Sequence, residues 1–251
     1  MVSLDQTLYT FVMNVRYYQL INKIFDSLKI RDALSALNLG DVSPFVRPFV
    51  TVARDPGSGG APIAEKVAQL LGYEYVHEQI VDQISQSTKK RRTIIKAVDE
   101  KSRSTIEDIV HSVLNKEYID DTTYVSELVK VILAYALRGH VVLLGRGANF
   151  ICPAAKGLHV RITAPYSVRV QRAMEYEGFN RVKAKQVIAK VEAERDDFVR
   201  QYFKKDPTEA NYYDLTINTA HYTVDAAADV IVDAFYKKFS RMARYTAVLS
   251  K

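Results

Sequence analysis

The sequence predicts an α/β fold in which helices cover both faces of a parallel β-sheet. Segments with strand and helix patterns alternate along the chain, which is typical of that arrangement. Residues 141–144 form an uninterrupted apolar run, as expected for a central strand buried on both faces. An apolar segment at 49–53 leads into a glycine-rich loop and then at once into a helical pattern. With 251 residues, the chain is long enough for one large domain with an appendage.

The elements are expected in the following order. Strands are expected at 49–53, 73–76, 140–145, 158–163 and 213–217. Helices are expected at 62–71, 78–87, 104–115, 123–138, 166–177, 181–203 and 224–240. Apolar residues near helical spacing predict that 1–45 is a helical N-terminal extension, packed on the main domain (46–251) or on a second subunit as a homodimer contact.

Composition limits the class of protein and its compartment. Cys152 is the only cysteine, so the sequence suits a reducing cytoplasm. The sequence has no cysteine pair and no closely spaced histidines, so it does not predict a metal site. No segment has the length and apolarity of a membrane span, and the N-terminus does not have the pattern of a signal peptide. We therefore expect a cytoplasmic protein without a membrane partner.

The charge balance is basic, with a net charge of +6 and a pI near 9.2. Such a surplus suits anionic small molecules or nucleic acid, and it also occurs on basic surfaces without a partner. The densest run, at 89–92, is either a solvated helix face or a contact with phosphate or nucleic acid. Aromatic residues do not interleave the run, which argues against nucleic acid as a partner.

The glycine loop is the strongest functional signal. A strand, a glycine loop and a helix form the layout that binds phosphates through backbone N–H groups, here at Gly57, Ser58, Gly59 and Gly60. The loop departs from the G-x-x-x-x-G-K-[ST] pattern, because Arg54 stands at the first glycine and Gly60 stands at the lysine. Pro62 also lacks the N–H and the hydroxyl of the usual residue. The sequence therefore predicts a phosphate site without its usual side chains.

Three motifs together resemble the cytidylate kinase-like family, a branch of the nucleoside monophosphate kinases. They are ARDPGSGG at 53–60, VVLLGRGANFI at 141–151 and ERDDFVRQYFKKDPTEANYYDLTINT at 194–219. The resemblance covers roughly 48–235 and implies a P-loop fold with a five-stranded parallel sheet and a mobile lid at about 169–205. It also implies ATP and Mg²⁺ as cofactors, with transfer of the γ-phosphoryl group to a nucleoside monophosphate, CMP-like, or to a similar small phosphate acceptor.

Two alternatives to this kinase activity stay open. One is a non-catalytic nucleotide-binding or regulatory protein on the same fold, which the missing loop groups favour. The other is a nucleic-acid-associated protein that uses the basic surface.

The resemblance and the position of each residue give the candidate site. Arg54 and Asp55 leave the first strand beside the glycines, with Arg54 expected toward phosphate and Asp55 toward Mg²⁺ or as a base. The alternative for these two residues is a local ion pair that braces the loop. Arg195 and Arg200 resemble catalytic lid arginines, and Arg169 and Arg172 resemble lid arginines that bind the nucleotide. Each of these four is alternatively a surface charge.

The acceptor is expected to contact Arg146, Arg103 and His77. Arg146 follows the central strand, at the carboxyl edge where open α/β sheets bind ligands. Its alternative is a pairing with a structural carboxylate, and the alternative for His77 is a structural role. Cytidylate kinases have an aspartate after this arginine, whereas Gly147 follows here, so the resemblance leaves the base preference open.

Overall fold

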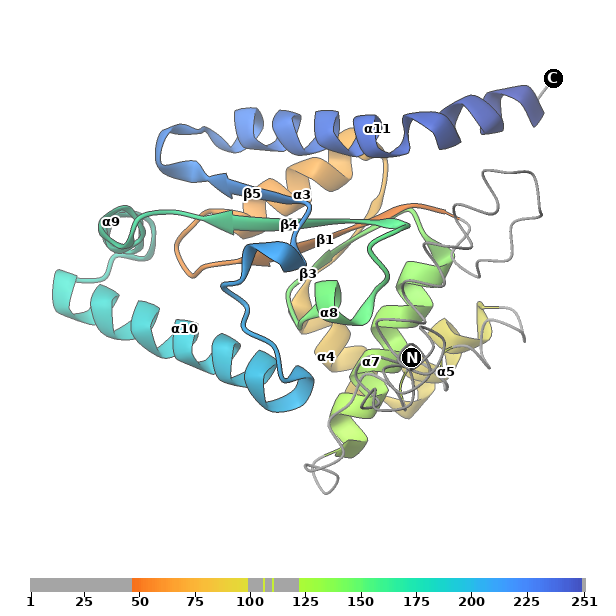
Figure 1. Ribbon diagram of the computed structural model, residues 1–251. Helices are drawn as coiled ribbons and strands as arrows, with labels where there is room; N and C mark the ends of the chain where they lie inside the picture. Colours follow the sequence, from red (N-terminus) through yellow and green to blue (C-terminus); the bar gives the residue numbers. More distant parts are fainter. Residues whose placement is uncertain (1–46, 99–105, 107–109, 111–121, 250–251) are drawn as a thin grey trace, which may run out of the picture.

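The computed structural model describes residues 47–98, 106, 110 and 122–249 (Figure 1). The expected extension at 1–45, most of the expected helix at 104–115 and the candidate residue Arg103 lie outside the described residues.

A five-stranded sheet forms the centre of the molecule, in the order β2-β3-β1-β4-β5, and each pairing is parallel. The strands are β1 (Phe49–Arg54), β2 (Glu74–Val76), β3 (Val141–Leu144), β4 (Gly157–Thr163) and β5 (Leu215–Asn218). The predicted five-stranded α/β fold is therefore confirmed. All five strands lie within two residues of their expected bounds, and the apolar runs of β1, β3 and β4 mark the central three most clearly.

Helices connect the strands. They are α3 (Gly60–Leu71), α4 (Glu78–Gln86), α5 (Thr88–Lys96), α7 (Thr122–Arg138), α8 (Ala148–Ile151), α9 (Tyr166–Glu177), α10 (Arg181–Phe203) and α11 (Val224–Leu249), with short 3₁₀ turns at η2 (Ala210–Tyr212) and η3 (Thr219–His221). Two of them, α5 and α8, were not expected from the sequence. None of the helices in the described ranges is long and apolar enough to cross a membrane.

The sheet lies between two layers of helices, and alternate side chains of β3 point into the two halves of the core. Val141 and Leu143 pack in a cluster with α4 and α7. Val142 and Leu144 pack on the other face with α3 and α11. Figure 1 shows α3 and α11 on one side of the sheet and α7 on the other. This double burial explains why β3 is apolar at every position.

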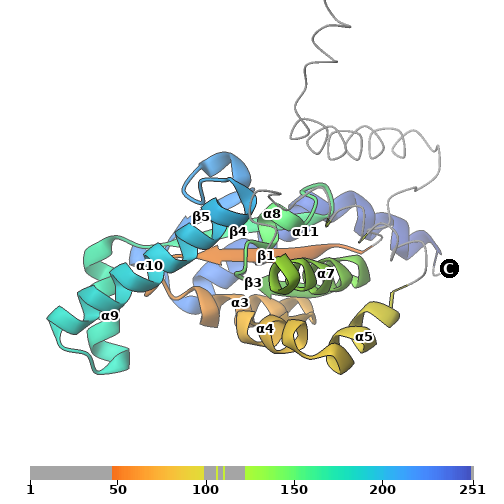
Figure 2. The ribbon, with the colours of Figure 1, turned by 90° about the horizontal axis from the view of Figure 1, so that it is seen from below.

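The carboxyl ends of β1, β3 and β4 meet at one edge of the sheet. The loop that follows β1 leads into α3, the turn after β3 leads into α8, and β4 leads into α9. The α9–α10 pair lies beside this edge (Figures 1 and 2). In open parallel sheets this edge is the usual place for a ligand.

Candidate functional site

The loop after β1 has the backbone that its glycines predict. Gly57 and Gly59 have φ values of 78° and 81°, in the left-handed region. A Cβ on Gly57 would lie 2.9 Å from the carbonyl oxygen of Arg169. Between the two glycines, Ser58 is buried, and its Oγ donates to the Asp55 carbonyl at 2.8 Å. Glycine is therefore required at position 57 for both conformation and space, and at position 59 for conformation.

The start of α3 leaves backbone donors unused. Within the described part of the chain, the N–H groups of Gly57, Gly59 and Gly60 find no acceptor. Gly59 is the N-cap of α3 and provides no side-chain cap. Unsatisfied N–H groups at the N-terminus of a helix favour an anion there.

Arg54 explains why the loop has no lysine. Its side chain runs between Gly60 and Gly145 to Glu78, where Nη2 lies 2.5 Å from Oε2. A Cβ on Gly60 would lie 2.4 Å from the Cβ of Arg54, and a Cβ on Gly145 would lie 2.3 Å from its Nη1. A lysine at position 60 is incompatible with this path, because the aliphatic part of Arg54 fills the space beside Gly60 while its guanidinium lies beside Gly145 and Glu78.

Three arginines of the α9–α10 pair hold alternate carbonyl groups of the loop. Arg54 O accepts from Arg195 Nη1 (3.3 Å), Pro56 O from Arg169 Nη1 (3.5 Å) and Ser58 O from Arg172 Nη1 (3.2 Å). Three of the four expected lid arginines therefore contact the loop after β1, and in this structure their partners are its carbonyl oxygens. Their predicted contact with phosphoryl groups stays a prediction.

Glu78, which the sequence reasoning missed, is the anionic centre of this group. Besides Arg54, Arg195 approaches it, with Nη2 3.7 Å from Oε1. Burial raises the pKa of Glu78, but Arg54, Arg195 and Arg146 outweigh burial and hold this pKa below its usual value. Burial and then the nearby Arg54 lower the pKa of Arg195 to about 10, so Arg195 stays charged at neutral pH.

Asp55 is held from β4. Its Oδ1 accepts from Arg161 Nη2 at 3.2 Å, and its Oδ2 accepts from the Thr163 hydroxyl at 2.5 Å. Arg161 also donates to the Thr208 carbonyl at 3.1 Å. The sequence reasoning missed Arg161, although a charged residue within the apolar β4 run was an available signal.

Arg146 is paired with a carboxylate, the alternative that the sequence left open. It has a left-handed backbone, with φ 52°. Its Nε and Nη2 donate to the two oxygens of Asp82 at 2.9 and 2.5 Å, and the Tyr124 hydroxyl donates to the same carboxylate at 2.7 Å. The guanidinium carbon lies 5.9 Å from the centre of the Phe198 ring. An acceptor phosphate would therefore share or replace Asp82 as the partner of Arg146.

Some of these residues line one small cavity of about 70 Å³ at the carboxyl edge of the sheet, next to the glycine loop, whose residues 57–60 do not line it themselves. Its charged lining residues are Arg54, Asp55, Glu78, Arg146, Arg161, Arg195 and Asp196. Phe150, Phe198 and Tyr213 line it as well. The cavity therefore joins four arginines with aromatic rings, a combination that suits a phosphate-bearing, planar ligand.

Other predicted site residues lie outside this cavity. Arg200 is exposed and lies 3.4 Å from Asp196 Oδ2 and 3.8 Å from Asp206 Oδ1. His77 is the N-cap of α4, and its Nδ1 accepts from the Gln79 N–H at 3.3 Å. The geometry therefore supplies a structural role for His77, which was one of its two interpretations.

No group of three or more histidine, cysteine or acidic side chains that could hold a metal ion occurs among the residues placed by the structure. Kinase sites usually hold Mg²⁺ through one or two carboxylates, water and the phosphates of the substrate. Asp55 and the Thr163 hydroxyl, in contact beside the loop, are oxygen donors of that kind. Both Asp55 oxygens already accept hydrogen bonds, from Arg161 and Thr163, so a Mg²⁺ ion brought by a nucleotide would replace at least one of these contacts.

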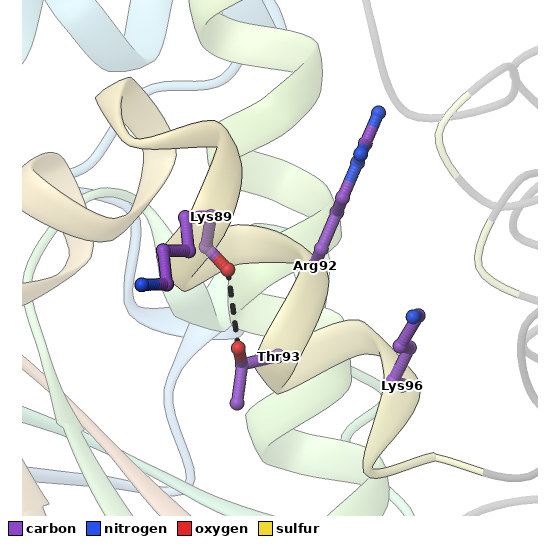
Figure 3. Close-up of a pocket in the computed structure, with 4 residues that line it drawn as sticks. All are labelled: Lys89, Arg92, Thr93 and Lys96. Carbon is purple, nitrogen blue, oxygen red and sulfur yellow. Dashed lines mark hydrogen bonds between the residues drawn. The ribbon is translucent and has the colours of Figure 1, made fainter.

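The basic run lies on α5, away from this site. Figure 3 shows Lys89, Arg92 and Lys96 on this helix, with the Thr93 hydroxyl donating to the Lys89 carbonyl at 3.1 Å. These side chains are exposed and line a separate cavity of about 410 Å³. Arg91 instead pairs with Glu127 of α7 at 2.6 Å, which fixes the helix on the domain. Lys89, Arg92 and Lys96 therefore lie on an exposed helix face, and a phosphate contact there stays a prediction.

Comparison with known proteins identifies the family. A model of the cytidylate kinase-like family matches residues 49–221. A cytidylate kinase of Halobacterium salinarum is 25% identical over 189 residues, which cover 74% of this chain and 88% of that protein. A uronate isomerase of Corynebacterium glutamicum is 30% identical over 99 residues, but these cover 39% of this chain and only 19% of the isomerase.

A solved structure agrees with the fold. An uncharacterized protein of Eubacterium ventriosum superposes with a TM-score of 0.53 at 18% identity, over 75% of this chain and 98% of that protein. The family match includes the glycine loop, Arg146 and the arginines of α9 and α10 within one continuous range. Together with the geometry of the loop, this shows that the chain belongs to the cytidylate kinase-like family, whose relatives support a nucleotide or small-molecule kinase.

Proposed function

We propose that the protein transfers the γ-phosphoryl group of ATP to a nucleoside monophosphate, CMP-like, or to a similar small phosphate acceptor. The observation that carries this proposal is the unused N–H groups of Gly57, Gly59 and Gly60, which lie beside an arginine-lined cavity. Phosphoryl transfer depends on positioning and on positive charge around the moving group, and both are available at this edge of the sheet.

Each residue has a role in the proposed reaction. The loop N–H groups bind the phosphates of ATP, and Arg54 and Arg195 supply cations at the loop. Arg146 binds the acceptor phosphate through its paired donors, as an arginine fork binds two oxygens. Asp55 with Thr163 would hold Mg²⁺, whose chemistry is to neutralise charge on the transferred group. Nucleotides are then the partners of the chain, and its single buried cysteine suits the cytoplasm.

Nucleotide binding without transfer is the second candidate, and specific observations favour it. Pro62 offers no N–H in the first turn of α3, and Arg54 excludes a lysine from position 60. The cavity of about 70 Å³ is also smaller than the roughly 300–1,000 Å³ of sites that hold small ligands. Under either candidate, the α9–α10 pair must move away from the loop before a nucleotide can enter.

A coupled assay of ADP release separates the two. The full chain is incubated with ATP and Mg²⁺, alone and with each common nucleoside monophosphate. The kinase proposal expects that one monophosphate raises ADP release far above the rate with ATP alone. Calorimetric binding of ATP together with no stimulation by any monophosphate would favour the second candidate.

A further inference from the structure

Thr219 makes a set of contacts that the proposed reaction has not yet used. It is buried at the start of η3, directly after β5. Its hydroxyl lies 2.7 Å from the Ser58 carbonyl oxygen and 3.2 Å from the Thr163 carbonyl oxygen. Because a hydroxyl has one proton, it donates chiefly to the nearer oxygen, which belongs to the glycine loop.

Arg172 of α9 completes the arrangement. Its Nη1 donates to the Thr219 hydroxyl oxygen at 2.9 Å and to the Ser58 carbonyl at 3.2 Å, and its Nη2 donates to the Thr219 carbonyl at 2.7 Å. The Ser58 carbonyl therefore accepts two hydrogen bonds from outside the loop. We call Thr219 and Arg172 together the Ser58 clamp.

The clamp fixes the direction of one peptide group. In a trans peptide, the C=O of Ser58 and the N–H of Gly59 point in opposite directions. Holding the carbonyl toward Thr219 therefore turns the Gly59 N–H to the other side of the peptide plane. This N–H is among the donors without an acceptor, and Gly59 is the N-cap of α3. Glycines at 57 and 59 leave this peptide free to rotate unless something holds it.

We propose that Thr219 is a positioning residue for the phosphate-binding loop, and that Arg172 acts through the same clamp and not as a direct phosphate ligand. The clamp orients the Gly59 N–H for a phosphate of the nucleotide before the nucleotide arrives. The inference rests on the proposed nucleotide site and adds to it the device that preorganises that site.

Replacing Thr219 by valine tests the role of its hydroxyl, because valine has nearly the same shape as threonine and lacks the hydroxyl. Thr219→Val removes the donor to Ser58 and the acceptor for Arg172, whereas Thr219→Ser keeps both. Thr51→Val is the matched control, because Thr51 is equally buried and its hydroxyl bonds His159 Nδ1 at 2.6 Å within the sheet, away from the loop.

Calorimetry with Mg²⁺-ADP on the full chain gives the first readout. We expect Thr219→Val to weaken ADP binding about tenfold, the usual effect of losing one to two hydrogen bonds. Thr219→Ser should bind within a factor of about three of the wild type. Thr51→Val should lower the melting temperature by as much as Thr219→Val and leave ADP binding unchanged. A purely structural role for Thr219 would make the two valine variants alike.

Amide NMR gives a second readout that does not need turnover. In the wild type, Mg²⁺-ADP should shift the Gly59 amide proton strongly, and in Thr219→Val the free protein should show this resonance broadened or displaced. If the wild type binds ADP and Thr219→Val binds it with the same affinity, the clamp is overturned and the proposed function still stands. Absence of any nucleotide binding by the wild type would overturn both.

Discussion

At the scale of single residues, the site pairs every central arginine with an acid or a carbonyl. Arg54 is bound to Glu78, Arg146 to Asp82 and Arg161 to Asp55. A phosphate entering the cavity must therefore compete with carboxylates that already hold the cations. Truncation of one partner leaves the other charge poorly compensated, which makes these pairs sensitive to substitution.

Arg146→Ala tests the acceptor side. The change removes the two hydrogen bonds to Asp82 and the fork expected to bind the acceptor phosphate. We expect the change in kcat/KM for the acceptor to correspond to a loss of about 2–4 kcal/mol in transition-state stabilisation. The change in ATP binding should be much smaller. Lys237→Ala, at an exposed pair with Asp233 on α11, is the control. Acceptor kinetics equal to those of the wild type would remove Arg146 from the site.

Position 60 tests the path of Arg54. Gly60→Lys, alone or with Pro62→Thr, places a Cβ 2.4 Å from that of Arg54 and should weaken ATP binding. Arg54→Gly removes the obstructing Cβ, so Arg54→Gly/Gly60→Lys should bind ATP more tightly than Gly60→Lys does. Calorimetry on the two single variants and the double variant measures this coupling. A gain in ATP affinity and turnover from Gly60→Lys/Pro62→Thr alone would show that Arg54 does not replace the lysine.

Sequence reasoning reached the local features of the site but not its long-range pairs. The glycines and Arg146 follow strands directly, so their positions at the edge of the sheet could be predicted. Asp82 and Tyr124 lie on α4 and α7, 42 residues apart, and only the packing of these helices brings them together at Arg146. Glu78 was missed because nothing in its neighbours indicates that Arg54 crosses the loop to reach it.

At the scale of elements, α4 begins at the charged centre of the site. Its N-cap is His77, and Glu78 occupies its first turn, where the helix dipole also favours a negative charge. The sequence predicted this helix within one residue. It did not predict α5, because the basic residues at 89–92 interrupt the apolar pattern and only Ile94 and Ile95 pack α5 against the core.

Glu78→Gln tests this element through its pH dependence. The folded-state pKa of Glu78 is below the ordinary 4.5, so its contribution to stability is present above pH 4.5 and is lost as the pH falls through the folded pKa. At pH 7 we expect the variant to be less stable by about 3 kcal/mol, because Arg54 loses its partner. The difference should persist down to about pH 4.5 and shrink at lower pH.

Urea unfolding at pH 7, 4.5 and 3.5 measures that difference. Asp233→Asn, at an exposed pair, should change stability by less than about 0.5 kcal/mol at each pH. A difference between wild type and Glu78→Gln that grows as the pH falls would contradict the depressed pKa.

At the scale of the whole molecule, the cavity and the arginine contacts describe a closed arrangement of α9–α10 over the sheet (Figures 1 and 2). Three hydrogen bonds hold these helices to the loop, and the remaining cavity is about 70 Å³. The proposed function therefore predicts that α9–α10 opens for nucleotide exchange. Sequence reasoning gave the approximate range of this unit from the resemblance, but its contacts with the loop carbonyls depend on the folded geometry.

Spin labels at Tyr176→Cys on α9 and Lys237→Cys on α11 measure the opening. Both positions are exposed, whereas Cys152 is buried and burial raises the pKa of its thiol, so the natural cysteine should stay unlabelled. Without nucleotide we expect two populations of distances, and Mg²⁺-ADP should shift them toward one. A single distance population under all conditions would contradict the opening that nucleotide entry needs under either candidate.

Phosphoryl transfer itself is the central claim, and direct detection of its products tests it most directly. The full chain, with ATP and Mg²⁺, is given each common nucleoside monophosphate, and ³¹P NMR follows the phosphates. We predict that one monophosphate becomes its diphosphate in equal amount with ADP, and that Arg146→Ala loses this conversion while it still binds ATP. Wild-type protein that binds ATP but converts no monophosphate would contradict a nucleoside monophosphate kinase.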